Sequence, residues 1–118
     1  MHKESVKQSI VDYIRENGSI TYSEIEEVMT AAGYNWRGNL ITCSNMNENA
    51  VFWAGWSSAA YALIGDLIRS GTIAREPCHV INYLVGGKCL NLPVLERYED
   101  LTTEHWLPCL FVLGKGKS

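Results

Sequence analysis

Signals that begin and end helices recur along this chain in one order, and that order restricts the folds open to it more than any other feature. Apolar residues at three- and four-residue spacing in residues 6–14 predict an amphipathic first helix, and Asn17-Gly18 ends it. After a short extended segment, Thr21 and Glu24 have the spacing of a capping box and begin a second helix. Two helices joined by a short strand are therefore expected before Gly33.

A third helix is predicted from Ser57 to Ser70. Either Ser57 or Ser58 caps its start, and Gly71 ends it. Its core-facing side is apolar and consists of Ala60, Leu63, Ile64, Leu67 and Ile68. Its other side offers few of the groups that read DNA bases, and its small residues Ala59, Ala62 and Gly65 suit close packing against another helix instead.

Strand-like sequence follows the third helix. Thr72–Glu76 is a predicted strand. His79–Val85 and Lys88–Leu92 are predicted to pair as a hairpin, because Gly86-Gly87 between them is a two-residue turn signal. The apolar sequence within Trp106–Leu113 predicts a last strand.

The connection between the second and third helices, residues 34–56, is far longer than the few residues of a simple helix-turn-helix. It either contains a short strand or helix of its own or acts as a functional loop. Val51–Trp53 is strongly apolar. We expect a short extended or helical turn there, which packs Phe52 and Trp53 into the core.

The charge balance counts against a nucleic-acid partner. The chain has 10 Lys and Arg against 13 Asp and Glu, for a net charge of -3, whereas phosphate binding usually requires a basic surface. Only the fold could gather the scattered basic residues on one face. Apolar runs are shorter than the roughly 18 residues of a membrane-spanning helix, and the N-terminus leads into an amphipathic helix rather than an apolar signal core. A cytoplasmic location without membrane contact is therefore expected.

In its order of elements the chain resembles the winged-helix superfamily over residues 3–92. The resemblance rests on the apolar positions of the helices, the second helix cap and the strand after the third helix: Val6, Ile10, Ile14, Thr21, Glu24, Ile25, Val28, Met29, Leu63, Ile64, Leu67, Ile68, Gly71 and Ile73. It implies an α+β fold, a winged helix-turn-helix of three helices with a small antiparallel β-sheet or hairpin and an extra C-terminal strand. Residues 1–118 would form one domain, with a core at 3–92 and a C-terminal extension at 93–118.

The first functional hypothesis follows from this resemblance, because most members of the superfamily bind duplex DNA through the third helix and the wing. The chain would be a transcriptional regulator, or a DNA-binding factor of the kind found in phages and mobile elements, and would act as a dimer. The third helix would lie near the major groove and the hairpin at 86–88 on the DNA backbone. The expected DNA-contacting residues are Ser57, Ser58, Tyr61, Arg69, Arg75 and Lys88.

The second hypothesis is a protein-interaction module, an adaptor or inhibitor that does not bind DNA. A sizeable minority of the superfamily uses the same surfaces for protein partners. The aromatic and polar sequence at Tyr34, Trp36 and Arg37 would form the contact surface, together with the Asn-rich segment 45–49. Trp and Arg are enriched at protein interfaces, and Trp36 is expected to be exposed.

The sequence contains no catalytic motif, so the chain is not expected to be an enzyme, and no cofactor is predicted. An enzyme stays a third alternative should a Cys–His or carboxylate pair converge in a pocket. A zinc site could be built only from Cys78, His79, Cys89, His105 and Cys109. Zinc ligands usually occur in closely spaced pairs, so no metal is predicted and the four cysteines are expected to be buried free thiols.

Overall fold

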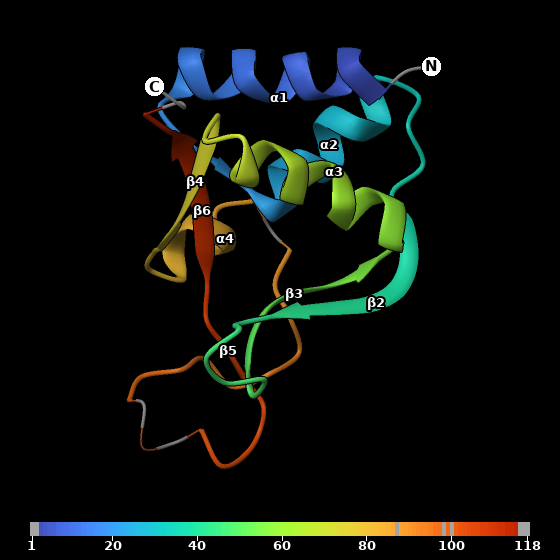
Figure 1. Ribbon diagram of the computed structural model, residues 1–118. Coiled ribbons are helices and arrows are strands. Elements are labelled where there is room, and N and C mark those ends of the chain that lie inside the picture. The colour runs from blue at the N-terminus through green and yellow to red at the C-terminus, as the bar shows by residue number, and fades with distance from the viewer. Residues whose placement is uncertain (1–2, 87, 98, 100, 116–118) are drawn as a thin grey trace.

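The computed structural model describes residues 3–86, 88–97, 99 and 101–115. This part of the chain forms four helices and two three-stranded β-sheets (Figure 1), so the predicted α+β class is confirmed. In chain order, the elements are α1 (Lys3–Asn17), β1 (Ile20–Thr21), α2 (Tyr22–Ala31), β2 (Arg37–Cys43), β3 (Ala50–Trp56), α3 (Ser58–Arg69), β4 (Ile73–Pro77), α4 (Ile81–Leu84), β5 (His105–Trp106) and β6 (Cys109–Leu113). None of these helices is both long and apolar enough to span a lipid bilayer.

The starts of α2 and α3 are fixed by the capping side chains expected from the sequence. Thr21 Oγ1 accepts a hydrogen bond from the Glu24 backbone N–H at 3.1 Å, and the Glu24 carboxylate accepts one from the Thr21 backbone N–H at 2.9 Å. Ser57 Oγ accepts a hydrogen bond from the Ala60 backbone N–H at 3.2 Å. These caps satisfy N–H groups that have no partner inside the helix. The predicted capping box and the predicted third helix are confirmed.

β1, β6 and β4 form an antiparallel sheet in that order, so the last strand of the chain lies in its middle. Phe111 of β6 lies opposite Ile20 of β1 on one side and Arg75 of β4 on the other. Figure 1 shows α1 crossing one end of this sheet, over α2 and α3. The predicted last strand is confirmed, and the C-terminal segment at 93–118 therefore supplies the centre of a sheet.

The hairpin predicted between His79–Val85 and Lys88–Leu92 is wrong. Residues 81–84 form the short helix α4, and residues 88–92 contain no strand. Gly87, half of the expected turn, lies outside the described residues. The third helix is therefore not followed by the expected wing.

Local hydrogen bonds explain why the chain is helical at α4. His79 Nδ1 accepts a hydrogen bond from the Ile81 backbone N–H at 3.1 Å, and the His79 carbonyl oxygen accepts one from the Asn82 side chain at 2.9 Å. Such side-chain bonds compete with strand pairing. The turn also places Tyr83 in the core with 0% of its surface exposed. Burial of this ring and the local bonds outweigh the strand preference of the β-branched residues around it.

The 34–56 connection contains a β-hairpin of its own. β2 and β3 pair antiparallel with an irregular register, and β5 pairs parallel to β3. Val51–Trp53 is extended, with Phe52 and Trp53 only 9% and 0% exposed. The prediction for this segment is confirmed. Figure 1 shows this second sheet on the side of the molecule away from α1.

A cluster of aromatic rings joins the two sheets. The Trp53 ring stacks on Tyr22 with the ring centroids 5.7 Å apart, and the Trp53 and Tyr83 centroids are 5.2 Å apart. Trp106 packs against Tyr83 at 5.0 Å, and Phe111 against Tyr22 at 5.1 Å. All five side chains are buried. α4 and the C-terminal strands are therefore part of the same core as the first two helices.

Candidate functional site

Glu26 is a carboxylate on the core-facing side of α2, and only 4% of its surface is exposed. Its Oε2 accepts hydrogen bonds from the indole N–H groups of Trp53 at 2.9 Å and Trp56 at 2.8 Å. Residues three apart in a regular strand point to opposite faces. Gly55, between the two tryptophans, has a φ of 94°, which breaks the alternation and lets both indoles reach the same oxygen.

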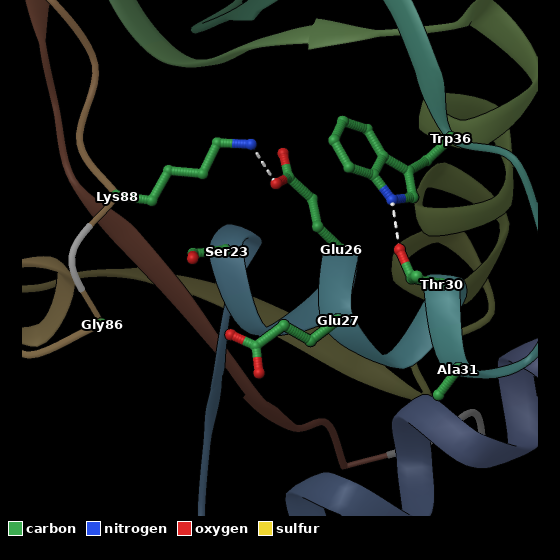
Figure 2. A pocket seen from close by; sticks show the side chains of 8 residues that line it. All are labelled: Ser23, Glu26, Glu27, Thr30, Ala31, Trp36, Gly86 and Lys88. Atoms are coloured by element: carbon green, nitrogen blue, oxygen red, sulfur yellow. Dashed lines mark hydrogen bonds and ion pairs between the residues drawn. The ribbon is translucent and has the colours of Figure 1, made fainter.

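Lys88 completes the set of partners. Its ammonium group binds Glu26 Oε1 and lies 4.8 Å from the ring centroid of Trp36 (Figure 2). The Trp36 indole N–H donates to Thr30 Oγ1 at 3.0 Å, which fixes the ring against α2. The Glu26 side chain is 6% exposed and the Lys88 side chain 48% exposed. The carboxylate is thus part of the interior, while the ammonium group reaches it from the surface.

These side chains line a groove of about 460 Å³ beside α2. Its lining residues are Ser23, Glu26, Glu27, Thr30, Ala31, Trp36, Gly86 and Lys88, as Figure 2 shows. The volume falls within the range of about 300–1,000 Å³ that is typical of ligand sites. The groove therefore has the size of a binding site, and a buried carboxylate, Glu26, lies at its floor.

The groove is suited to hold a positively charged group. Its floor is the Glu26 carboxylate, its wall is the Trp36 ring, and the exposed Glu27 adds a second negative charge. Because Oε2 of Glu26 already accepts two indole N–H groups, Oε1 is the atom that a group in the groove meets. In this structure the group is the ammonium of Lys88.

Three of the residues predicted to contact DNA, Tyr61 and Arg69 on α3 and Ser57 at its N-cap, make contacts within the protein. Ser57 caps the helix. The Tyr61 hydroxyl donates to the Leu40 carbonyl oxygen at 3.1 Å, and its ring stacks on Trp56 with the centroids 5.0 Å apart. Arg69 donates to Asp66 at 2.6 Å. Arg69, followed by Lys7, holds the pKa of Asp66 below its ordinary value by hydrogen bonding. Ser58 is exposed at the first position of the helix.

The two predicted DNA contacts outside α3 are also directed inward. The Arg75 guanidinium lies 4.3 Å from the ring centroid of Phe52 and donates to the Tyr22 hydroxyl at 3.1 Å. Burial raises the pKa of Tyr22 to about 12, and Arg75 opposes that rise. Lys88, expected at the tip of a wing, is bound to Glu26 instead.

Of the residues predicted to contact a protein partner, Trp36 lines the groove, whereas Tyr34 and Arg37 do not. The expectation that Trp36 is exposed is wrong, because 9% of its surface is accessible and its ring packs between α2 and Lys88. Arg37 is exposed, and its guanidinium carbon lies 4.7 Å from the Trp36 ring centroid. Tyr34 is partly buried against the core. The structure thus brings Trp36, Arg37 and Lys88 together, although the sequence placed them in two separate hypotheses.

Glu26 is the central residue that sequence reasoning missed. Acidic residues in the first turns of a helix interact favourably with its dipole, so Glu26 was not distinguished from its neighbours Glu24 and Glu27. A signal was present, however, because Tyr22, Glu26 and Met29 are spaced four and three residues apart and share one helix face. A carboxylate within an apolar stripe indicates a buried acid with partners supplied from elsewhere in the fold.

The cysteines and histidines do not form a metal site in the described ranges. No group of three or more His, Cys, Asp and Glu side chains there is placed to hold a metal ion. All four cysteines are free thiols, but the expectation that they are buried holds for Cys109 alone, because Cys43 and Cys78 are partly exposed and Cys89 is exposed. Cys78 and Cys109 lie near the ends of β4 and β6. Burial raises the pKa of Cys78 to about 11 and that of Cys109 to about 12, against a smaller opposing effect of Arg75 on Cys109.

We expect Cys109 and Cys78 to react much more slowly than the exposed Cys89 with iodoacetamide at pH 8. Only the thiolate attacks iodoacetamide. Because the pKa is about 11 for Cys78 and about 12 for Cys109, about 0.1% or less of either thiol is ionised at pH 8. Reactivity at these two sites should rise as the pH increases. Mass spectrometry of the native protein, quenched over a time course, measures the order of labelling. Modification of Cys109 ahead of Cys89 in the folded protein would contradict the burial described above.

Comparison with known proteins gave no relatives: no family model, no curated protein and no solved structure matches this chain.

Proposed function

We propose that this chain is a winged-helix protein-interaction domain, which binds a partner polypeptide in the groove lined by Glu26, Trp36 and Lys88. The order α1, β1, α2, α3, β4 supports the winged-helix assignment, because the resemblance implies these elements in this order, and β6 takes the place beside β4 that the hairpin at 79–92 does not fill. The antiparallel pairing of β4 with β6 after α3 supports it further. On this assignment the β2–β3 hairpin, α4 and β5 are additions to the basic fold.

The observation that carries the protein-interaction role is the groove itself. It combines an aromatic wall, a carboxylate floor and an exposed acidic rim on a protein with a net charge of -3. Such a surface repels the phosphates of DNA and attracts basic side chains of a protein. The cation closest to it, Lys88, is already paired with a buried acid.

Exposed apolar side chains on the β2–β3 hairpin give a second reason to favour a protein partner. Leu40 and Ile41 of β2 are 45% and 53% exposed, and Met46 in the turn is 95% exposed. Apolar side chains that gather on one exposed element often mark interaction surfaces, and methionine adapts to varied partners. The hairpin begins at Arg37, beside the Trp36 wall of the groove.

Panning of a random peptide library displayed on phage tests this function. We expect peptides that bind the wild type to bind Glu27→Lys about tenfold or more weakly, because that substitution reverses a charge at the rim of the groove. Fluorescence polarisation with the selected peptides measures the affinities. Glu76→Lys is the matched control, since Glu76 is exposed on β4 and does not line the groove.

Two outcomes of this experiment would contradict the proposal. A library that yields no binding peptide would argue against a protein-interaction role. Peptides that bind Glu27→Lys and Glu76→Lys with equal affinity would place the contact surface away from the groove.

DNA binding is the second candidate function, and the same element order favours it. Its expected contacts fit less well, because Lys88 is paired with Glu26, Arg75 lies against Phe52, and the Tyr61 hydroxyl is bonded to the Leu40 carbonyl oxygen of β2. A salt titration with duplex DNA decides between the two candidates.

A further inference from the structure

We infer that the groove binds the primary ammonium group of a lysine side chain on the partner polypeptide, and that Lys88 fills this site as an internal stand-in which the partner's lysine displaces. This inference rests on the proposed function, and it names the group that the groove recognises. It is carried by the arrangement of Glu26, its two indole donors, the Trp36 ring and Lys88.

The floor of the site is a carboxylate that stays in place whether or not Lys88 is bound. Two indole N–H groups, from Trp53 and Trp56, hold Glu26 Oε2 at 2.9 and 2.8 Å. The side chain is 6% exposed, so water screens its charge weakly. These two donors are neutral, and the carboxylate therefore keeps its negative charge available for a cation at Oε1.

The wall of the site provides a second attraction for a cation. The Lys88 ammonium lies 4.8 Å from the centroid of the Trp36 ring and 6.0 Å from that of Trp53. A cation within about 6 Å of an indole face is attracted by the ring quadrupole. The Trp36 ring is held in position by its hydrogen bond to Thr30, so the wall is formed before a ligand arrives.

The geometry favours an ammonium group over a guanidinium group. Arginine binds a carboxylate best through two parallel hydrogen bonds, one to each oxygen. Here Oε2 of Glu26 already accepts two N–H donors, which leaves Oε1 alone to face the groove. A compact charge with rotatable donors, as at the end of a lysine side chain, matches a single oxygen.

Lys88 is able to leave the site without taking the site apart. Its side chain is 48% exposed, and it lies outside any helix or strand, with exposed Gly86 and Cys89 nearby. Once it leaves, the charged residues that line the groove are Glu26 and Glu27, and their two negative charges favour entry of another cation. While Lys88 occupies the site, the partner's lysine cannot bind there. The partner's apparent affinity is therefore its intrinsic affinity multiplied by the fraction of molecules in which the groove is open.

The test opens the groove with Lys88→Ala and adds a lysine probe, Nα-acetyl-lysine N-methylamide. The indole N–H signals of Trp36, Trp53 and Trp56 are followed by NMR at constant ionic strength. We expect saturable shifts, with a Kd at least about tenfold lower than that of the wild type, because the internal competitor is gone. The arginine analogue should bind more weakly than the lysine probe, and the Nε-acetylated lysine probe should not bind.

Glu26→Gln/Lys88→Ala is the matched control, because its groove is open but its floor is neutral. We expect no saturable shift with this double variant. Equal binding of the lysine probe to the single and double variants, or no binding to Lys88→Ala, would overturn the inference. If Lys88→Ala does not fold alone, refolding is measured with and without the probe. Recovery of the folded state only with the probe supports the site, and no recovery overturns it.

Two further comparisons separate this inference from its alternatives. If the lysine probe binds more tightly than propylammonium, the site recognises a lysine within a polypeptide. Equal affinities would show that the site recognises any free primary amine, and would overturn the inference that it binds a lysine of the partner. Peptides from the panning experiment that lack lysine, yet lose affinity for Glu27→Lys, would keep the proposed function and overturn only the lysine site.

Discussion

Replacement of Glu26 with Ala is expected to lower the free energy of unfolding by about 3–5 kcal/mol. The substitution leaves the indole N–H groups of Trp53 and Trp56 buried without an acceptor, and each such group costs about 1–3 kcal/mol. The small cavity it creates adds to the loss. Lys88 contributes less, because its half-exposed side chain is able to turn to water. Urea denaturation followed by tryptophan fluorescence measures the change.

Glu26→Gln is the matched control for this prediction. Its amide oxygen is able to accept both indole hydrogen bonds, so we expect a loss of under about 2 kcal/mol, which reflects mainly the unpaired Lys88. The difference between the two variants reports the indole contacts and the cavity together, apart from the ion pair with Lys88. If Glu26→Ala unfolds at the same urea concentration as the wild type, Glu26 does not hold the two tryptophans as described.

Replacement of Tyr83 with Phe is expected to cost about 2–4 kcal/mol, although it removes a single oxygen atom. The Tyr83 hydroxyl donates to the Cys109 carbonyl oxygen of β6 and accepts a hydrogen bond from the Tyr22 backbone N–H at 3.0 Å. Both groups would lose their partner in the interior, at about 1–3 kcal/mol each. Burial raises the pKa of Tyr83 above its ordinary value, as expected for a hydroxyl in this environment. Urea denaturation measures this loss too.

Tyr13→Phe provides the comparison for this second variant. The Tyr13 hydroxyl donates to Glu24 at 3.0 Å in a partly exposed position, so water replaces the lost bond. We expect a loss of under about 1 kcal/mol there. Equal losses for the two variants would show that the hydrogen bonds of the Tyr83 hydroxyl do not anchor α4 in the core.

The parts of the fold that were predictable from the sequence depend on local chemistry. Thr21 and Glu24 form a capping box because their spacing alone brings them together. The third helix begins after Ser57, whose side chain caps it, and ends before Gly71, which adopts a left-handed backbone conformation. Both signals are local in the sequence. The apolar run at Val51–Trp53 was assigned to the core because no other environment suits it.

The hairpin at 79–92 was mispredicted because the deciding interactions are distant in the sequence. A turn signal and β-branched residues favour strands locally, but Tyr83 is drawn into a cluster with Trp53 and Trp106. The strand that pairs with β4 comes instead from Cys109–Leu113, more than thirty residues later. Long-range pairing of this kind leaves no local signal in the sequence.

The candidate site could be predicted only in fragments. Trp36, Arg37 and Lys88 were singled out as aromatic or basic residues, but Lys88 was expected on a wing. Glu26 joins them because the strand carrying Trp53 and Trp56 bends at Gly55. The position of that strand beside α2 depends on the tertiary structure, and it brings the two indoles to Glu26.

The central claim is that Lys88 and Arg75 serve the groove and the fold rather than contact with DNA. Fluorescence polarisation with a labelled random-sequence duplex, measured from about 20 to about 200 mM salt, tests it most directly. We predict no binding tighter than about 100 µM even at the lowest salt, because Lys88 is paired with Glu26 and Arg75 is bonded to Tyr22, on a protein with a net charge of -3. A Kd below about 1 µM that weakens steeply as salt is added would contradict this account.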